Sequence, residues 1–252
     1  MQLSRSGPVE AAAPGTGRKR IGRLTASPLA HRGLHGRGRI ENSRAAFAAA
    51  IRKGHGIELD VQASSDGHAF VFHDYDLDRL TEESGCVADR SSAELKQIRL
   101  KGSEETIPTL AEILELIGSQ VPVLIEVKAP DRNVTALCLS VMRALEGYRG
   151  PVGVMSFNPE VSRWFAVHAP RVTRGLVVTE SEKGRLRGWI ERRLALWRAR
   201  PEFLAYDVRD FPSRFASRAR RRGLPVFTWT VRNAKQAKIG RTNADQIIYE
   251  AA

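Results

Sequence analysis

The chain alternates short apolar runs with longer segments in which apolar residues recur at helical spacing. Each run is short and is bounded by glycine, proline or polar residues, which predicts a buried strand. Strands that alternate with helices are parallel and are joined by right-handed crossovers. Eight such runs predict an α/β fold with a single (β/α)8 TIM barrel. The expected strands are residues 28–31, 56–61, 123–127, 152–156, 173–178, 203–208, 225–230 and 246–249, and the expected helices between them are residues 43–53, 135–146, 159–166, 184–199, 214–222 and 233–239.

A ninth apolar run, residues 69–72, does not fit the parallel set. Only residues 62–68 separate it from the strand before it, whereas a parallel neighbour needs a crossover of about a dozen residues or more. The run therefore predicts an antiparallel strand. Asp66 and Gly67 suit the tight turn between the two strands, because glycine accepts a positive φ and aspartate tolerates one.

This β-hairpin carries His73 towards the carboxylates of the second strand. Counting back from the turn pairs His73 with Asp60 or, if the register slips, with Glu58. Helical patterns at residues 93–99 and 110–117 follow. They predict a small helical insertion between the hairpin and the third barrel strand.

Chemically active residues stand where four of the apolar runs end. In a barrel of parallel strands the carboxyl ends converge on one mouth, so residues far apart in the sequence meet there. The inventory suits metal-assisted attack on a phosphate ester, because carboxylates hold a hard cation, histidines move protons, and arginine or lysine offsets phosphoryl charge. The residues are His31, Arg32, Glu58, Asp60, His73, Glu126 and Lys128.

The three carboxylates are the expected metal ligands. Glu58 and Asp60 alternate on one strand and so share a face, and Glu126 ends the next parallel strand. Ligation by oxygen alone favours Mg²⁺ or Ca²⁺ over zinc. The alternative is that Glu126 forms an ion pair with Lys128, on the same face, and that no metal binds.

The order of the motifs resembles that of the glycerophosphodiester phosphodiesterase family, and the resemblance covers most of the chain. The family pattern runs HRG, ENT or ENS before an alanine-rich helix, E-x-D-V, D-G, V-V-x-H-D, I-P-T-L, E-x-K, S-F and W-T-V. Each motif alone is a weak signal, and it is their common order that carries the resemblance. The matching residues are His31-Arg32-Gly33, Glu41-Asn42-Ser43, Glu58-Leu59-Asp60-Val61, Asp66-Gly67, Val71-Phe72-His73-Asp74, Ile107-Pro108-Thr109-Leu110, Glu126-Val127-Lys128, Ser156-Phe157 and Trp229-Thr230-Val231.

The resemblance implies metal-dependent hydrolysis of a glycerophosphodiester to sn-glycerol 3-phosphate and an alcohol such as choline, ethanolamine or glycerol. It implies that His31 and His73 act as acid and base, in an order that the sequence leaves open. It also implies that Arg32 and Lys128 hold the phosphoryl oxygens. A cyclic intermediate formed by the glycerol 2-hydroxyl and direct attack by water both remain open.

The match weakens near the end of the chain. Arg232 stands where the family pattern has Asn after W-T-V, and the usual G-I-I-T-D reads Gln246-Ile247-Ile248-Tyr249-Glu250. We expect these positions near the mouth, so the substrate pocket should differ from the usual one. Trp229 is expected either to pack against the glycerol carbons or to fill the core.

Length and composition predict the domain organisation and the cellular compartment of the protein. The length of 252 residues is ordinary for one barrel, which we expect over residues 26–252, while residues 1–25 lack an apolar run and predict a flexible basic tail. Cys86 and Cys138 form no CxxC pair or disulfide framework, which favours a cytoplasmic protein. The sequence contains no run of about 18 apolar residues, so it does not predict a membrane-spanning helix.

The net charge of +12 raises the question of a nucleic-acid partner. Much of the excess lies in residues 185–200 and 214–222, where arginine alternates with apolar residues at helical spacing. We therefore expect solvated helix faces and no nucleic acid, although such faces can weakly attract anionic surfaces. Two other functions remain open: a phosphodiesterase for a larger lipid diester, of the lysophospholipase D or phospholipase C type, and a non-catalytic basic binding protein. The sequence does not indicate an oligomeric state.

Overall fold

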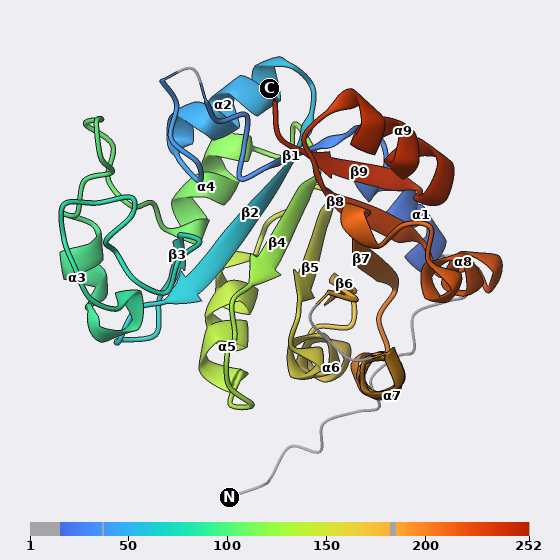
Figure 1. Cartoon of the computed structure of the whole chain (residues 1–252). Coiled ribbons are helices and arrows are strands. Elements are labelled where there is room, and N and C mark those ends of the chain that lie inside the picture. The colour runs from blue at the N-terminus through green and yellow to red at the C-terminus, as the bar shows by residue number, and fades with distance from the viewer. Residues whose placement is uncertain (1–15, 37, 182–184, 252) are drawn as a thin grey trace, which may run out of the picture.

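Eight parallel strands close into a ring at the centre of the molecule, and helices surround it (Figure 1). The computed structural model describes residues 16–36, 38–181 and 185–251. Neighbouring strands follow chain order around the ring, and pairing of β1 with both β9 and β2 closes it. The expected (β/α)8 barrel is therefore confirmed. Its strands are β1 (Leu29–His31), β2 (Gly56–Ala63), β4 (Val123–Val127), β5 (Val152–Ser156), β6 (Thr173–Val178), β7 (Phe203–Asp207), β8 (Val226–Val231) and β9 (Gln246–Tyr249).

The expected helices are found with boundaries shifted by a few residues at most. Their starts follow local chemistry: Ser43 accepts a hydrogen bond from the Ala46 N–H at the start of α2, and Thr109 forms a capping box with Glu112 at the start of α4. The helices are α1 (Thr16–Leu24), α2 (Arg44–Arg52), α3 (Ser92–Leu95), α4 (Leu110–Ile117), α5 (Thr135–Ala144), α6 (Pro159–His168), α7 (Arg185–Ala199), α8 (Arg214–Arg221) and α9 (Ala234–Asn243), with short 3₁₀ helices at Val87–Asp89 and Val208–Asp210.

The ninth strand, β3 (Ala69–Val71), runs antiparallel to β2 at the outside of the ring, as the short connection requires. Neither expected partner of His73, Asp60 or Glu58, is correct, because the register of the hairpin differs from the expected one by one residue. Val71 lies opposite Val61, and the Phe72 N–H donates to the Asp60 carbonyl at 3.1 Å. His73 follows just after the strand, and the insertion behind it contains α3 and α4.

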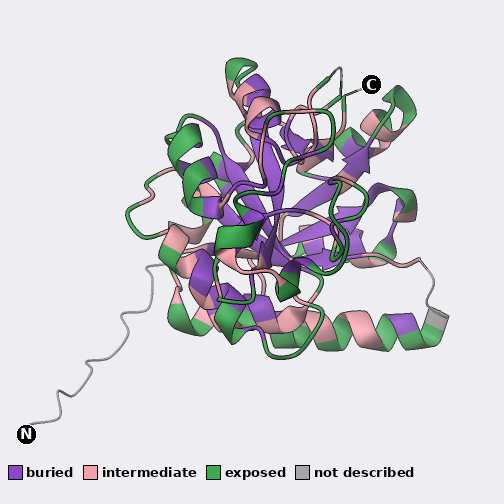
Figure 2. Ribbon diagram, turned by 90° about the vertical axis from the view of Figure 1, so that its left-hand side faces the viewer, coloured by how far each residue is buried: buried purple, intermediate pink, exposed green. Residues whose placement is uncertain are grey.

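The strands separate an inner from an outer core, and both lie within the buried centre of the molecule (Figure 2). Leu29 and Leu124 belong to the inner cluster, whereas Ala30 and Ile125 belong to the cluster under the surrounding helices. Because side chains alternate along a strand, residues two positions beyond Leu29 and Leu124 also point inwards. His31 and Glu126 occupy those two positions.

Helix α1 corrects the expected tail in part. Residues 16–24 form a helix with Ile21 and Leu24 buried in the inner core, and Arg20 pairs with Glu202 at 2.8 Å. A side chain on Gly153, near the start of β5, would meet the Leu24 Cδ1 at 2.9 Å, so α1 packs closely against the amino end of the ring. The remainder of the predicted tail, residues 1–15, lies outside the described residues.

Replacing Leu24 tests this packing. Its side chain is 1% exposed, so Leu24→Ala should lower the free energy of unfolding by about 2–5 kcal/mol, the usual cost of such a truncation in a core. Urea titration followed by circular dichroism measures the loss. Arg23→Ala, at an exposed position of the same helix, is the matched control and should change stability little. Equal stability of the two variants would show that α1 is not part of the core.

Candidate active site

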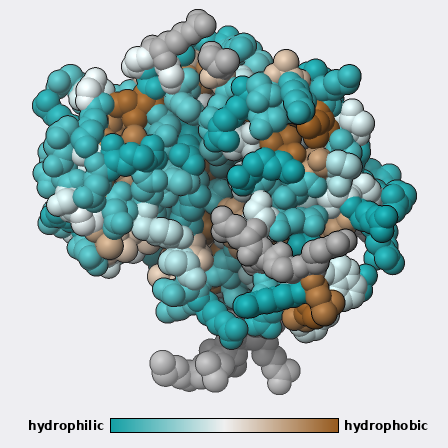
Figure 3. Space-filling view, viewed as in Figure 1, coloured by the Kyte–Doolittle hydropathy of each residue, from teal (hydrophilic) through white to brown (hydrophobic). Residues whose placement is uncertain are grey.

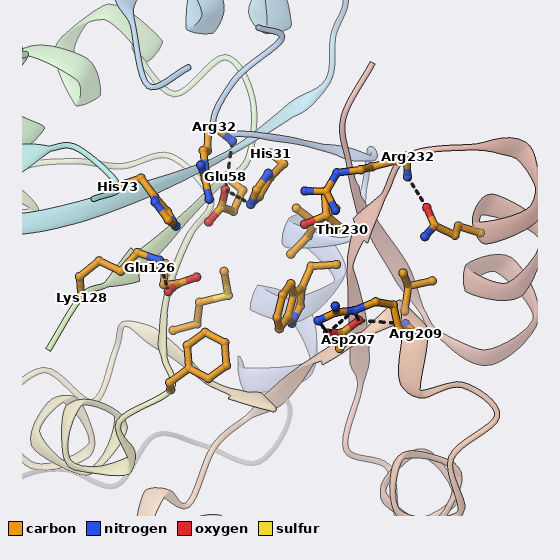
Figure 4. Close-up of a pocket in the computed structure, with 16 residues that line it drawn as sticks. His31, Arg32, Glu58, His73, Glu126, Lys128, Asp207, Arg209, Thr230 and Arg232 are labelled. Atoms are coloured by element: carbon orange, nitrogen blue, oxygen red, sulfur yellow. Dashed lines mark hydrogen bonds and ion pairs between the residues drawn. The ribbon is translucent and has the colours of Figure 1, made fainter. Parts of the chain in front are cut away.

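The inward-facing ends of β1, β2 and β4 bring four acid or base side chains together. His31 lies in register with Glu58, and Asp60 with Glu126. All four residues are buried, and an oxygen atom from each of the three carboxylates lies within 4.8 Å of the other two. The structure therefore places the three expected metal ligands side by side. Figure 4 shows two of them, Glu58 and Glu126, with His31 next to Glu58.

These residues line a pocket with a cavity volume of about 260 Å³. His73 and Lys128 line the same pocket (Figure 4). One wall is charged, and the other is formed by Met155, Phe157, Trp229 and Ile248. All eight residues selected from the sequence lie around this one cavity, including Asp60, which contacts the lining residues Arg32 and Lys128.

The turn after β1 aims Arg32 at the carboxylates. Arg32 has a φ of 55°, and its backbone N–H donates to Glu58 Oε2 at 3.1 Å. Its guanidinium reaches Glu41 at 2.7 Å and Asp60 at 3.2 Å. Gly33 follows with a φ of 78°, and a Cβ there would lie 2.9 Å from Ala46 and Phe47 of α2. Only glycine fits this close approach.

Asp60 is held between cations. Lys128 Nζ lies 3.0 Å from Asp60 Oδ1 and 2.6 Å from Glu126 Oε1, and Asn42 donates to Asp60 Oδ2 at 3.0 Å. Burial opposes the charge, but Lys128 and Arg32 outweigh it and hold the pKa of Asp60 well below its usual range. The alternative ion pair between Glu126 and Lys128 is thus present, and Lys128 bridges two of the three carboxylates.

Neighbouring cations do not offset the burial of the Glu58 carboxylate as they do that of Asp60. Its Oε1 atom is buried and accepts no hydrogen bond from any described residue. Burial, followed by the charge of Asp60, raises the pKa of Glu58 to about 8. A partnerless buried carboxylate oxygen beside two further carboxylates is suited to a hard divalent cation, so these residues fit a metal ion of the kind expected from the sequence.

Each histidine is fixed by a carboxylate at Nδ1. His31 Nδ1 lies 2.7 Å from Glu250 Oε1, and its Nε2 lies 3.9 Å from Glu58. Burial lowers the pKa of His31, but Glu58 and Glu250 outweigh burial and raise it above the usual value. His73 Nδ1 lies 2.6 Å from Asp74 Oδ1, and burial lowers its pKa. In both histidines Nδ1 is engaged and Nε2 is left for the pocket.

Sequence analysis did not assign Glu250 a role, and it treated Arg232 only as a departure from the family pattern. In the structure Arg232 Nε lies 2.6 Å from Glu250 Oε2, so the two departures contact one another. His31 and Arg232 lower the pKa of Glu250 to about 2 against the effect of burial. No spacing in the sequence reveals this contact, because it depends on β8 and β9 ending side by side.

Trp229 lies between the pocket and the inner core. Its indole N–H donates to the Ala205 carbonyl at 3.0 Å, and its ring lines the pocket. Phe157 packs edge-on against it, with 5.6 Å between ring centroids. Trp229 therefore has part of both expected roles: one edge is anchored to the barrel and one surface is available to a ligand.

Comparison with known proteins identifies the family. Residues 31–250 match the model of the glycerophosphoryl diester phosphodiesterase family. The chain belongs to this family, and it is a phosphoric diester hydrolase. A glycerophosphodiester phosphodiesterase of Caldanaerobacter subterraneus subsp. tengcongensis is 32% identical over 235 residues, which are 87% of this chain and 92% of that protein.

Solved structures agree with this assignment. A phosphodiesterase of Oleispira antarctica, in complex with the product sn-glycerol-3-phosphate, superposes with a TM-score of 0.77 and 26% identity over 88% of this chain and 92% of that one. A glycerophosphodiester phosphodiesterase of Thermotoga maritima gives a TM-score of 0.70 at 25% identity, covering 88% and 94%. Among the described residues, no helix has the length and apolar character needed to cross a bilayer.

Proposed function

We propose that the protein hydrolyses small glycerophosphodiesters to sn-glycerol 3-phosphate and an alcohol, with Mg²⁺ or Ca²⁺ held by Glu58, Asp60 and Glu126. The observation that carries the proposal is the buried, partnerless Oε1 of Glu58 within this carboxylate cluster, next to two oriented histidines. The product bound in the Oleispira antarctica structure supports the choice of substrate. When bound, the cation would supply Lewis-acid stabilisation of the phosphoryl charge.

Arg32 and Lys128 bind the phosphoryl oxygens in this proposal. An ammonium has three donor hydrogens and a guanidinium has five. Lys128 directs its ammonium at two carboxylates, and the Arg32 side chain likewise contacts two. Each cation therefore keeps donor capacity for a phosphoryl oxygen while its carboxylate partners hold it in place.

His31 and His73 move the protons. One removes a proton from the attacking hydroxyl, of water or of the substrate glycerol, and the other donates a proton to the leaving alkoxide. Glu250 and Asp74 fix the Nδ1 side of each ring, so the same nitrogen, Nε2, is presented to the substrate in both cases.

The apolar wall of the pocket favours a small diester over a lipid. The cavity of about 260 Å³ shares His73, Glu126, Lys128 and Phe157 with a second cavity of about 490 Å³, and the apolar wall of the first is formed by only four side chains. That wall matches the carbon skeleton of glycerol better than an acyl chain. A larger lipid diester is therefore the weaker candidate.

A substrate panel tests the proposal directly. Glycerophosphocholine, glycerophosphoethanolamine and glycerophosphoglycerol should each release glycerol 3-phosphate when Mg²⁺ or Ca²⁺ is present, and chelation should stop the release. A coupled glycerol 3-phosphate assay measures both effects. Faster turnover of lysophosphatidylcholine than of these substrates would instead support the lipid phosphodiesterase. Absence of turnover with every substrate and both cations would overturn the proposal.

A further inference from the structure

Helix α7 carries an apolar stripe on the side that faces away from the barrel. Five of the nine exposed large apolar residues among those described lie on this helix, at the three- and four-residue intervals of one helix face. Their exposed fractions run from 44% to 73%. Figure 2 shows α7 at the edge of the molecule, and Figure 3 shows hydrophobic side chains gathered where Figure 1 places it. The stripe consists of Leu186, Trp189, Ile190, Leu194 and Trp197.

The stripe is not the face by which α7 joins the fold. Ala199 is fully buried, and Ala195 and Leu196 pack against the same core cluster. Ala195 and Ala199 lie on the opposite side of the helix from the centre of the stripe, given the turn of about 100° per residue, and Leu196 lies between the two faces. A surface helix of a soluble domain needs one apolar face, and α7 has two.

Positive charge lies beside the stripe. Helix α8, with the sequence RFASRARR, has four arginines and no acid. A groove of about 1250 Å³ between α7 and α8 is lined by Trp189 and by Arg214, Arg218 and Arg221. These three arginines are exposed, and no hydrogen bond or ion pair joins their side chains to a described residue. Two carboxylates also line the groove: Glu180 is paired with Arg192, and Asp210 accepts hydrogen bonds from the Thr179 hydroxyl and the Glu180 N–H.

We propose that α7 and α8 dock on the surface of an anionic lipid bilayer. The stripe would enter the boundary between headgroups and acyl chains, where tryptophan and leucine are favoured, and the groove arginines would contact lipid phosphates. The positive charge of the groove favours an anionic bilayer as the partner of this surface. A second copy of the chain would bring the same positive groove into contact with the first, and a nucleic acid would offer no apolar phase for the stripe.

The position of α7 sets the orientation of the docked enzyme. Helix α7 follows β6, whose carboxyl end lies at the mouth, so its amino end is near the mouth and its stripe runs down the side of the barrel. In this orientation the barrel lies on its side against the membrane, and its mouth remains open to water. Docking is therefore compatible with a small soluble substrate and does not depend on the proposed catalytic function.

Vesicle co-sedimentation tests the proposal. The full chain should bind phosphatidylcholine vesicles that contain phosphatidylglycerol and should bind pure phosphatidylcholine vesicles at least about tenfold more weakly, because each arginine near an anionic surface adds binding energy. The fluorescence of Trp189 and Trp197 should shift to shorter wavelength on binding.

Two variants separate the stripe from the charge. Trp189→Ser with Trp197→Ser should weaken binding about tenfold or more, since both rings lose their apolar contact with lipid. Arg218→Gln with Arg221→Gln should weaken it to a similar extent. The matched controls are Val167→Ser with Leu116→Ser, and Arg143→Gln with Arg241→Gln, exposed residues on other helices, and these should bind like the unaltered chain. Diester turnover should be unchanged in all four variants.

Three results would overturn the proposal. The first is equal binding to vesicles with and without phosphatidylglycerol, or equal losses in the test and control variants. The second is a dimer in sedimentation velocity that the Trp189→Ser, Trp197→Ser variant converts to monomer, which would assign the stripe to a second copy. The third is binding to duplex DNA that competes with vesicles and survives loss of both tryptophans, which would assign the groove to nucleic acid.

Discussion

Glu58→Gln should lower kcat/KM by about a hundredfold to a thousandfold, the range seen when one charge-stabilising group is removed from a reaction centre. The same variant should be at least as stable as the unaltered protein when no metal is added. Its neutral amide removes the repulsion between Glu58 and the buried Asp60 and Glu126, while an amide oxygen still accepts the Arg32 N–H. Turnover and thermal unfolding measure the two effects.

Metal addition completes this test. Mg²⁺ or Ca²⁺ at about 100 times its Kd should stabilise the unaltered protein by about 2.7 kcal/mol and should stabilise Glu58→Gln much less. Glu115→Gln, an exposed carboxylate on α4, is the matched control and should keep both the activity and the metal effect. If Glu58→Gln were active and stabilised by metal like the control, the carboxylate cluster would not be the metal site.

Loss of either pocket histidine should be the second large effect. His31→Ala and His73→Ala should each reduce kcat by about a hundredfold or more, the usual value of a positioned proton transfer, while stabilisation by metal persists. The double variant should lose less than the product of the two, since both groups serve one proton-transfer cycle. His168→Ala, an exposed histidine on α6, should have full activity.

A substrate with a p-nitrophenolate leaving group assigns the two roles. That group departs without a proton, so it should restore turnover to the variant that lacks the acid and not to the variant that lacks the base. If the activated substrate rescued neither variant, or if both variants lost stabilisation by metal, the histidines would be scaffold or ligands, and the acid-base assignment would fail.

The barrel could be predicted because its signals are local. Each strand is a short apolar run, and the brief connection between β2 and β3 dictated an antiparallel partner. The inward direction of Glu58, Asp60 and Glu126 followed from two-residue periodicity and from the register of parallel neighbours. The exact partner of His73 did not follow, because a turn of uncertain length moves the register by one residue.

Features that depend on contacts between distant segments could not be predicted. The link from Arg232 through Glu250 to His31 joins the first and last strands of the barrel, and no pattern in either segment predicts it. Among the side chains of helix α1 that the structure describes, only Ile21 and Leu24 are buried, too few positions to reveal a helical period. The arginines of α7 were expected to indicate a solvated face, yet its exposed apolar stripe is visible only once the buried side of the helix is known.

The position of α1 bears on how the chain is made. Helix α1 is synthesised before every strand of the barrel, but Leu24 belongs to a buried cluster that includes Ile248 of β9. The Thr25 carbonyl, just after α1, accepts a hydrogen bond from Gln246 at the start of the same strand. The surface that buries Leu24 is therefore complete only after β9 has been synthesised. Until β9 has emerged, α1 can pack against only part of this surface, so its final docking belongs to the late steps of barrel folding.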